Sequence, residues 1–234
     1  MSGDPGLRIH RPRGEIRGVA VVLHGGRSES SLPVRPSQVA VLRMIPFDRA
    51  LRHAGARHGL AVVRLLFRVR GWNGRLESPV HDARWALDRI RDRFPAVPIA
   101  LLGHSMGGRA ALRVADDESV TAVVAVAPWL PAGEPVNDVE GARILIMHGT
   151  RDRMTDPRTS AAWAVRARAA GAQVSYVSVR GARHAMLRRA RLAHDLASGF
   201  ILGALWDMPA AGTADGPATN PLRRALAGEP SLVV

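Results

Sequence analysis

The chain of 234 residues has no cysteine and no lysine, and it has few aromatic side chains. The absence of cysteine excludes disulfide bonds, thiolate metal sites and a cysteine nucleophile. No apolar run approaches the ~20 residues that span a bilayer, and residues 1–12 lack the apolar stretch of a signal peptide. We therefore expect a cytoplasmic protein without a membrane span, whose length suits one domain with a sizeable core.

The formal net charge is +13, and all 33 basic residues are arginine. A basic chain raises the question of nucleic acid, but these arginines are scattered and do not interleave with aromatic side chains, as a stacking platform requires. Arginine together with abundant Ala, Gly, Val and Pro is typical of a GC-rich genome. We therefore expect no specific nucleic-acid partner, although a basic surface attracts anionic substrates or membranes non-specifically.

Short β-branched runs alternate with longer stretches of helical period. The strands are predicted at 19–23, 61–66, 99–102, 121–127, 143–147 and 174–179, and the helices at 45–58, 78–94, 105–115, 157–170 and 184–206. This alternation predicts an α/β fold with a mostly parallel central sheet and helices on both faces. Ligands of such sheets bind at the carboxyl ends of the strands.

The apolar period is lost after residue 206. We predict one domain over residues 1–206 and a flexible Ala/Gly/Pro-rich C-terminal extension over residues 207–234, in which 222–226 could form one helical turn.

A Gly-x-Ser-x-Gly motif, Gly103-His104-Ser105-Met106-Gly107, lies between a predicted strand and a predicted helix. In this context the turn strains the serine backbone and lifts its hydroxyl above the sheet. Glycine is needed two residues before and after the serine because side chains there would collide with the returning backbone. The motif predicts Ser105 as a catalytic nucleophile in a nucleophile elbow; the alternative is a glycine-rich turn with an incidental serine.

A serine nucleophile needs a base, and the base needs an acid that orients it. In this architecture the three residues follow one another along the chain in the order Ser, then Asp or Glu, then His. Asp152 follows one predicted strand and His184 follows the next, so Ser105, Asp152 and His184 form a candidate catalytic triad. Asp152 could instead be a turn residue and His184 a surface histidine. Asp156 is the nearest rival acid, although Asp156-Pro157 has the pattern of a helix N-cap.

The candidate oxyanion hole combines the amide of Met106 with the loop His24-Gly25-Gly26-Arg27. We assign the second donor to Gly26, with Arg27 as the neighbouring option. The phosphate-binding glycine patterns are absent. His24, His104 and His148 lie near strand ends, but they lack ligand spacing and an accompanying carboxylate, so we expect no metal and no cofactor.

Together these motifs resemble the α/β-hydrolase family over residues 19–205, especially its small members related to dienelactone hydrolases and short esterases. The resemblance implies a small-molecule acyl substrate whose ester, thioester or amide bond is attacked by Ser105, an acyl-enzyme, and hydrolysis by water. Dienelactone hydrolases use cysteine, which this chain lacks. Only residues 128–141 separate two predicted strands, so no sizeable cap domain fits and the site should be open or covered only by loops.

Arg27, Trp72 and Trp129 are candidate substrate-binding residues, and structural packing is an equal alternative for each tryptophan. The leading function is a carboxylic-ester or thioester hydrolase. An acyltransferase with the same triad and a non-catalytic binding protein remain as alternatives. The sequence does not indicate the oligomeric state.

Overall fold

A computed structural model describes residues 4–137, 139, 141–206 and 220–234. These residues form an eight-stranded sheet with the order β1-β3-β2-β4-β5-β6-β7-β8, in which β1 alone runs antiparallel to its neighbour. The strands are β1 (Gly6–His10), β2 (Gly18–Leu23), β3 (Leu60–Leu66), β4 (Ile99–His104), β5 (Val120–Val126), β6 (Arg143–Gly149), β7 (Gln173–Val179) and β8 (Ser231–Val233).

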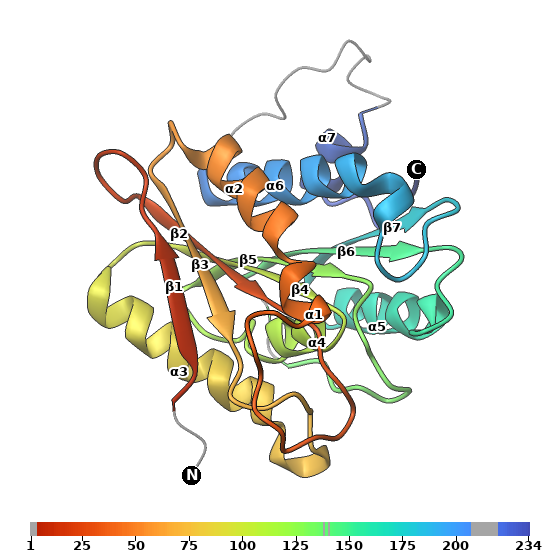
Figure 1. Cartoon of the computed structure of the whole chain (residues 1–234). Coiled ribbons are helices and arrows are strands. Elements are labelled where there is room, and N and C mark those ends of the chain that lie inside the picture. The colour runs from red at the N-terminus through yellow and green to blue at the C-terminus, as the bar shows by residue number, and fades with distance from the viewer. Residues whose placement is uncertain (1–3, 138, 140, 207–219) are drawn as a thin grey trace.

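Helices cover both faces of the sheet (Figure 1). One face carries α2 (Ile45–Gly55), α6 (Ala190–Trp206) and α7 (Pro221–Leu226), and the other carries α3 (Ser78–Arg93), α4 (Met106–Arg113) and α5 (Pro157–Ala169). The short α1 (Val39–Leu42) precedes α2. Each face has its own apolar cluster, which is why β2 and β4 are buried along their whole length and consist almost entirely of apolar residues.

The predicted fold class is confirmed. Each of the six predicted strands is present, and between β5 and β6 the described residues form no helix, so no large cap covers the sheet. The helix predicted from residue 184 begins only at Ala190, because Met186 has a positive φ of 57° that interrupts the helical path. The edge strand β1 was not predicted, since its five residues contain only two large apolar side chains.

The predicted C-terminal extension over 207–234 is wrong for residues 220–234. Asn220 caps α7 through its side chain, and glycines of α6 meet this helix so closely that a Cβ at Gly199 would lie 2.4 Å from Leu222. The last strand, β8, pairs with β7 and buries Leu232. This segment therefore completes the sheet and one apolar layer. Residues 207–219 lie outside the described residues.

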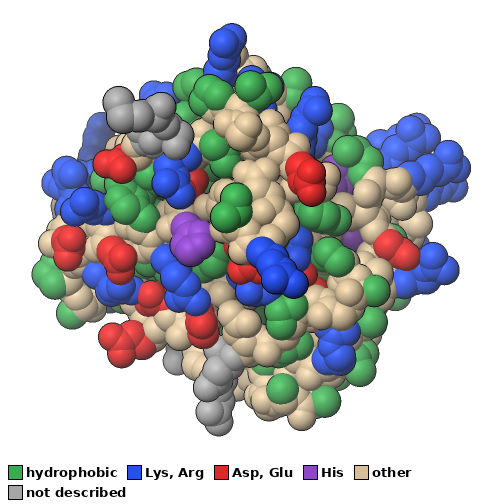
Figure 2. Space-filling model, turned by 90° about the horizontal axis from the view of Figure 1, so that it is seen from below, with side chains coloured by type: hydrophobic (Ala, Val, Ile, Leu, Met, Phe, Trp, Pro, Cys, Tyr) green, Lys and Arg blue, Asp and Glu red, His purple; other side chains and the backbone are tan. Residues whose placement is uncertain are grey.

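Charged and apolar side chains are interspersed on the face shown in Figure 2. Basic side chains there alternate with acidic and apolar ones, so this face presents no continuous basic field. Among the described residues, no helix combines the length and apolarity that a membrane crossing requires.

Candidate active site

The turn between β4 and α4 has the strained geometry that the motif predicts. Ser105 has φ 56° and ψ −119°, a conformation that L-residues rarely adopt. A Cβ at Gly103 would lie 2.2 Å from the Gly107 carbonyl oxygen, and a Cβ at Gly107 would lie 2.5 Å from that of Leu23. Both positions therefore require glycine, and the chain can turn sharply around Ser105.

The loop that follows β2 lies directly against the start of α4. A Cβ at Gly26 would lie 2.3 Å from the Arg70 carbonyl oxygen and 2.4 Å from Met106 Cε, so only glycine fits. Within the described part of the chain, the amide groups of Gly26 and Met106 have no hydrogen-bond acceptor. The amide of Arg27 donates to Arg70 at 2.8 Å, which removes Arg27 as an alternative oxyanion donor.

The buried side chain of His24 holds this loop through two hydrogen bonds. Its Nδ1 donates to the Gly25 carbonyl at 2.7 Å, and its Nε2 accepts from the Phe67 amide at 3.2 Å. This pattern requires the neutral ring. Burial lowers the pKa of His24 to about 4, which agrees with that tautomer. The loop carrying Gly26 is thus anchored to the segment after β3.

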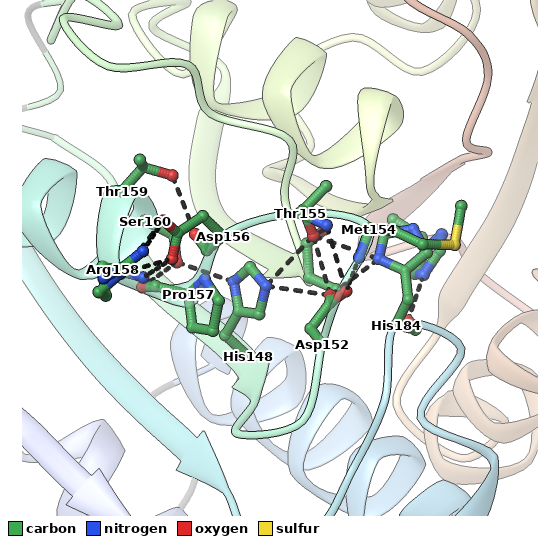
Figure 3. A network of polar contacts seen from close by, with 12 residues as sticks. His148, Asp152, Met154, Thr155, Asp156, Pro157, Arg158, Thr159, Ser160 and His184 are labelled. Carbon is green, nitrogen blue, oxygen red and sulfur yellow. Dashed lines mark hydrogen bonds and ion pairs between the residues drawn. The ribbon is translucent and has the colours of Figure 1, made fainter.

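Asp152 and His184 meet through a short hydrogen bond (Figure 3). Nδ1 of His184 donates to Oδ2 of Asp152 at 2.8 Å, while Oδ1 accepts from the amides of Met154 at 2.8 Å and Thr155 at 3.2 Å. Asp152 follows β6 and His184 follows β7, so both lie at the carboxyl edge of the sheet, as the sequence predicts. The rival, Asp156, caps α5 and pairs with Arg158 instead.

Two further side chains hold Asp152, and neither was singled out from the sequence as a partner of this carboxylate. Nε2 of His148 donates to Oδ2 at 3.1 Å, and the Thr155 hydroxyl donates to the same oxygen at 2.8 Å (Figure 3). Nδ1 of His148 lies 2.8 Å from the hydroxyl of Ser160. The only sequence signal for the contact between His148 and Asp152 was their spacing in His148-Gly149-x-x-Asp152. A tight turn at the end of a strand brings residues four positions apart close together.

Asp152 is held in its ionised form. Burial alone would raise its pKa, but hydrogen bonds from His148, His184 and the Met154 amide outweigh burial and hold the pKa below its usual range. The carboxylate can therefore keep a proton on Nδ1 of His184 and leave Nε2 as the basic nitrogen.

The loops that carry Asp152 and His184 are tied to each other. The Arg151 amide donates to the Ala182 carbonyl at 2.9 Å, and a Cβ at Gly149 would lie 2.4 Å from that same oxygen. Glycine after His148 is therefore needed for the two loops to approach.

His104 links the elbow to the histidine loop. Its Nε2 lies 2.9 Å from the His184 carbonyl oxygen, and the two imidazole centroids are 4.7 Å apart. Burial, with a contribution from His184, lowers the pKa of His104 to about 3, so the ring is neutral and donates to that carbonyl. Among the described residues, no hydrogen bond joins the Ser105 hydroxyl to His184, which is common before substrate binds.

The two candidate tryptophans pack on one arginine. The Arg109 guanidinium lies 3.7 Å from the Trp72 ring centroid and 4.8 Å from that of Trp129, and it pairs with Glu134 at 2.7 Å. Trp72 is only 2% exposed, so it offers almost no surface to a substrate and the structure favours the packing role. Trp129 is partly exposed and Arg27 is exposed, and both stay predictions as substrate-binding residues.

The histidines at the strand ends each have their own protein partners: His24 binds Gly25 and Phe67, His104 binds His184, and His148 binds Asp152. In residues 4–137, 139, 141–206 and 220–234, no group of three or more potential ligands could hold a metal ion.

A small apolar pocket of about 270 Å³ lies beside the segment that follows His184. Apolar side chains from α1, the start of α2 and residues 185–190 form most of its wall, with Arg43 and His194 as the polar members. Leu42 and Leu187 are 45% and 77% exposed, so apolar surface here faces solvent. Sequence patterns did not indicate this pocket, because it joins segments more than 130 positions apart.

Comparison with known proteins supports this architecture. A family model described as "Serine aminopeptidase, S33" matches residues 58–143, a span that contains the elbow but ends before Asp152. Among curated protein sequences, none matches the chain significantly.

Many solved structures share the fold. An alpha-beta serine hydrolase homologue from Coxiella burnetii is 23% identical with a TM-score of 0.61, covering 82% of this chain and 89% of that chain. An α/β serine hydrolase without lid from Xanthomonas campestris is 22% identical with a TM-score of 0.59, covering 81% and 84%. A monoacylglycerol lipase from Paleococcus ferrophilus is 17% identical with a TM-score of 0.59, covering 85% and 99%.

The sheet order, the strained serine turn and these structural similarities show that the chain has the α/β-hydrolase fold. The neighbour described as having no lid has the same fold, and this chain has a short β5–β6 connection.

Proposed function

We propose that this α/β hydrolase cleaves a carboxylic ester or thioester through an acyl-enzyme on Ser105. The observation that carries the proposal is the 2.8 Å hydrogen bond between His184 Nδ1 and Asp152 Oδ2, on loops beside the strained Ser105 turn. This pair fixes the tautomer in which Nε2 can accept a proton, which is what a serine nucleophile requires.

In the proposed reaction, the Ser105 oxygen attacks the substrate carbonyl carbon while its proton passes to His184 Nε2. The ionised Asp152 stabilises the resulting imidazolium. The amides of Gly26 and Met106, which have no acceptor among the described residues, would donate to the developing oxyanion. Each such donor contributes about 3 kcal/mol to transition-state stabilisation. The imidazolium then protonates the departing alcohol or thiol.

The second half of the reaction repeats these steps with water. His184 Nε2 removes a proton from a water molecule, which attacks the acyl-enzyme carbonyl carbon. The imidazolium then returns this proton to the Ser105 oxygen as the bond to the acyl group breaks, which releases the acid and restores Ser105. The described residues between β5 and β6 form no cap, so water is free to reach this intermediate. This favours hydrolysis over transfer of the acyl group to an alcohol or amine.

The apolar pocket next to His184 supports a preference for short acyl chains. Its volume of about 270 Å³ lies just below the range of pockets that hold drug-sized ligands, about 300–1,000 Å³. We place the apolar part of the substrate there, with the exposed Leu187 at its margin.

The test is initial-rate hydrolysis of p-nitrophenyl acetate, butyrate and laurate by the full chain and by Ser105→Ala. We expect turnover of the short esters, slower turnover of the laurate, and no turnover above background by Ser105→Ala. Faster hydrolysis of the laurate would contradict the assignment of the pocket. Activity that survives Ser105→Ala would refute the acyl-enzyme. Product analysis with added butanol would identify an acyltransferase if butyl ester exceeded free acid.

A further inference from the structure

A second cavity is larger than the apolar pocket beside residues 185–190. It lies at the opposite end of the parallel strands, where β2 and β3 begin. It is an open groove of about 970 Å³ between the β1–β2 connection, the C-terminal half of α2 and the start of β3. Figure 1 shows these segments together at the upper left, where the loop after β1 lies beside the end of α2. The parallel strands begin at this edge. A six-residue strand such as β2 spans about 20 Å, so the groove is remote from Ser105.

The lining of the groove is strongly basic. Three histidines and one carboxylate, Glu15, accompany six arginines, whereas the whole chain has 33 basic and 20 acidic residues. All six arginines are exposed: Arg11, Arg13, Arg17, Arg49, Arg52 and Arg57.

Five of these six guanidinium groups have no carboxylate partner among the described residues. Arg52 pairs with Asp48 at 3.5 Å, and Arg11 lies over the ring of Phe94 at 5.4 Å. Elsewhere on the surface, arginines such as Arg84 and Arg91 pair with aspartates. Like charges held around one hollow repel each other, and a bound polyvalent anion would remove that cost.

The donor chemistry selects phosphate. A guanidinium group presents a planar fork of N–H donors that matches two oxygens of a phosphate, and several forks around one groove match several phosphates. Phe, Tyr and Trp are absent from the lining, so the groove lacks the large aromatic rings on which nucleobases stack most strongly. The large exposed apolar side chains of the described surface also lie elsewhere, so nothing here would insert into a lipid layer.

We propose that this groove is a binding site for a small polyvalent phosphate compound, such as an oligophosphate, separate from the Ser105 site. The ligand is held by the unpaired arginines of the β1–β2 connection, by Arg49 of α2 and by Arg57 in the turn after α2. A ligand that carries several phosphates should bind with higher affinity than separate phosphate ions. Once its first phosphate is bound, the next phosphate is already held close to the other arginines. Sodium tripolyphosphate should therefore bind more tightly than inorganic phosphate.

Isothermal titration calorimetry with sodium tripolyphosphate tests the proposal. We expect saturable binding by the full chain, weakened by added salt. The double variant Arg49→Gln/Arg57→Gln should lose affinity by about tenfold or more, since a hydrogen bond to a charged group contributes about 1.5–3 kcal/mol. The matched control Arg75→Gln/Arg191→Gln removes two exposed charges outside the groove and should change affinity less than about twofold.

Equal losses in the groove variant and the control, or no saturable binding, would overturn the proposal. Co-sedimentation with phosphatidylcholine vesicles containing phosphatidic acid tests the lipid source of the same phosphate chemistry. Binding to these vesicles without binding of tripolyphosphate would reject the small-molecule ligand. Tighter binding of a single-stranded oligonucleotide than of tripolyphosphate would also reject it. All groove substitutions are at exposed positions, and unchanged melting curves would show that the variants fold.

Discussion

Replacing Asp152 by Asn tests the orienting acid with little change of shape. Oδ1 of the new amide can still accept from the amides of Met154 and Thr155, so the loop should keep its geometry. The Nδ2 group would take the place of Oδ2, which now accepts from His184, His148 and the Thr155 hydroxyl. An amide nitrogen cannot accept these hydrogen bonds.

The consequence is a change in the tautomer of His184. With a donor opposite, Nδ1 becomes the acceptor and the proton moves to Nε2, which can then no longer take the proton of Ser105. The equivalent change in a serine protease lowers kcat by about 10⁴-fold with the geometry intact. That ratio corresponds to about 5.5 kcal/mol of lost transition-state stabilisation. We expect a loss of this order for Asp152→Asn.

The assay is kcat for p-nitrophenyl acetate at neutral pH, with thermal melting followed by circular dichroism. Asp156→Asn is the matched control, because Asn caps a helix as well as Asp and Asp156 faces solvent beside Arg158. It should retain wild-type turnover. A loss of less than tenfold in Asp152→Asn, or a comparable loss in Asp156→Asn, would refute the assigned role.

Three further predictions concern the supports of the site. Thr155→Val removes the hydroxyl that donates to Asp152 and should lower kcat about tenfold with KM unchanged. The control Thr159→Val should leave kcat unchanged, and equal effects of the two substitutions would contradict the role of Thr155. Gly103→Ala places a Cβ 2.2 Å from a backbone oxygen and should cost about 1–3 kcal/mol or more in urea unfolding, and unchanged stability would show that the turn is not tight. The pKa of His24 is about 4 in the folded protein, against 6.5 for a free histidine. Its contribution to stability is therefore fully present above pH 6.5, and up to about 3 kcal/mol is lost as the pH falls toward 4. A free energy of unfolding that stays constant over this pH range would contradict the prediction.

The buried strands and the elbow could be predicted because they have strong local signals. A strand buried on both faces must be apolar throughout, and the Ser105 turn admits only glycine at two fixed positions. Asp152 and His184 were predictable from a simple property of parallel sheets, since residues just beyond successive strand ends meet at one edge.

The remaining features depend on contacts between distant segments. Helix α7 and β8 were assigned to an extension, because α7 is too short to show a period and the contact of Leu222 with Gly199 is not visible in composition. Trp72 was considered as part of an acyl pocket, but its ring is covered by Arg109, a contact across 37 positions. The basic groove likewise joins two arginine-bearing segments that are unremarkable when read separately.

Labelling with a fluorophosphonate, followed by intact mass measurement and peptide mapping, tests directly whether Ser105 is the nucleophile. The probe reacts only with a serine whose hydroxyl is activated by a base and whose oxyanion site is formed. We expect one equivalent of adduct on Ser105, abolished in Ser105→Ala and strongly slowed in His184→Ala. Folded wild-type protein that remains unlabelled, or an adduct on another residue, would contradict it.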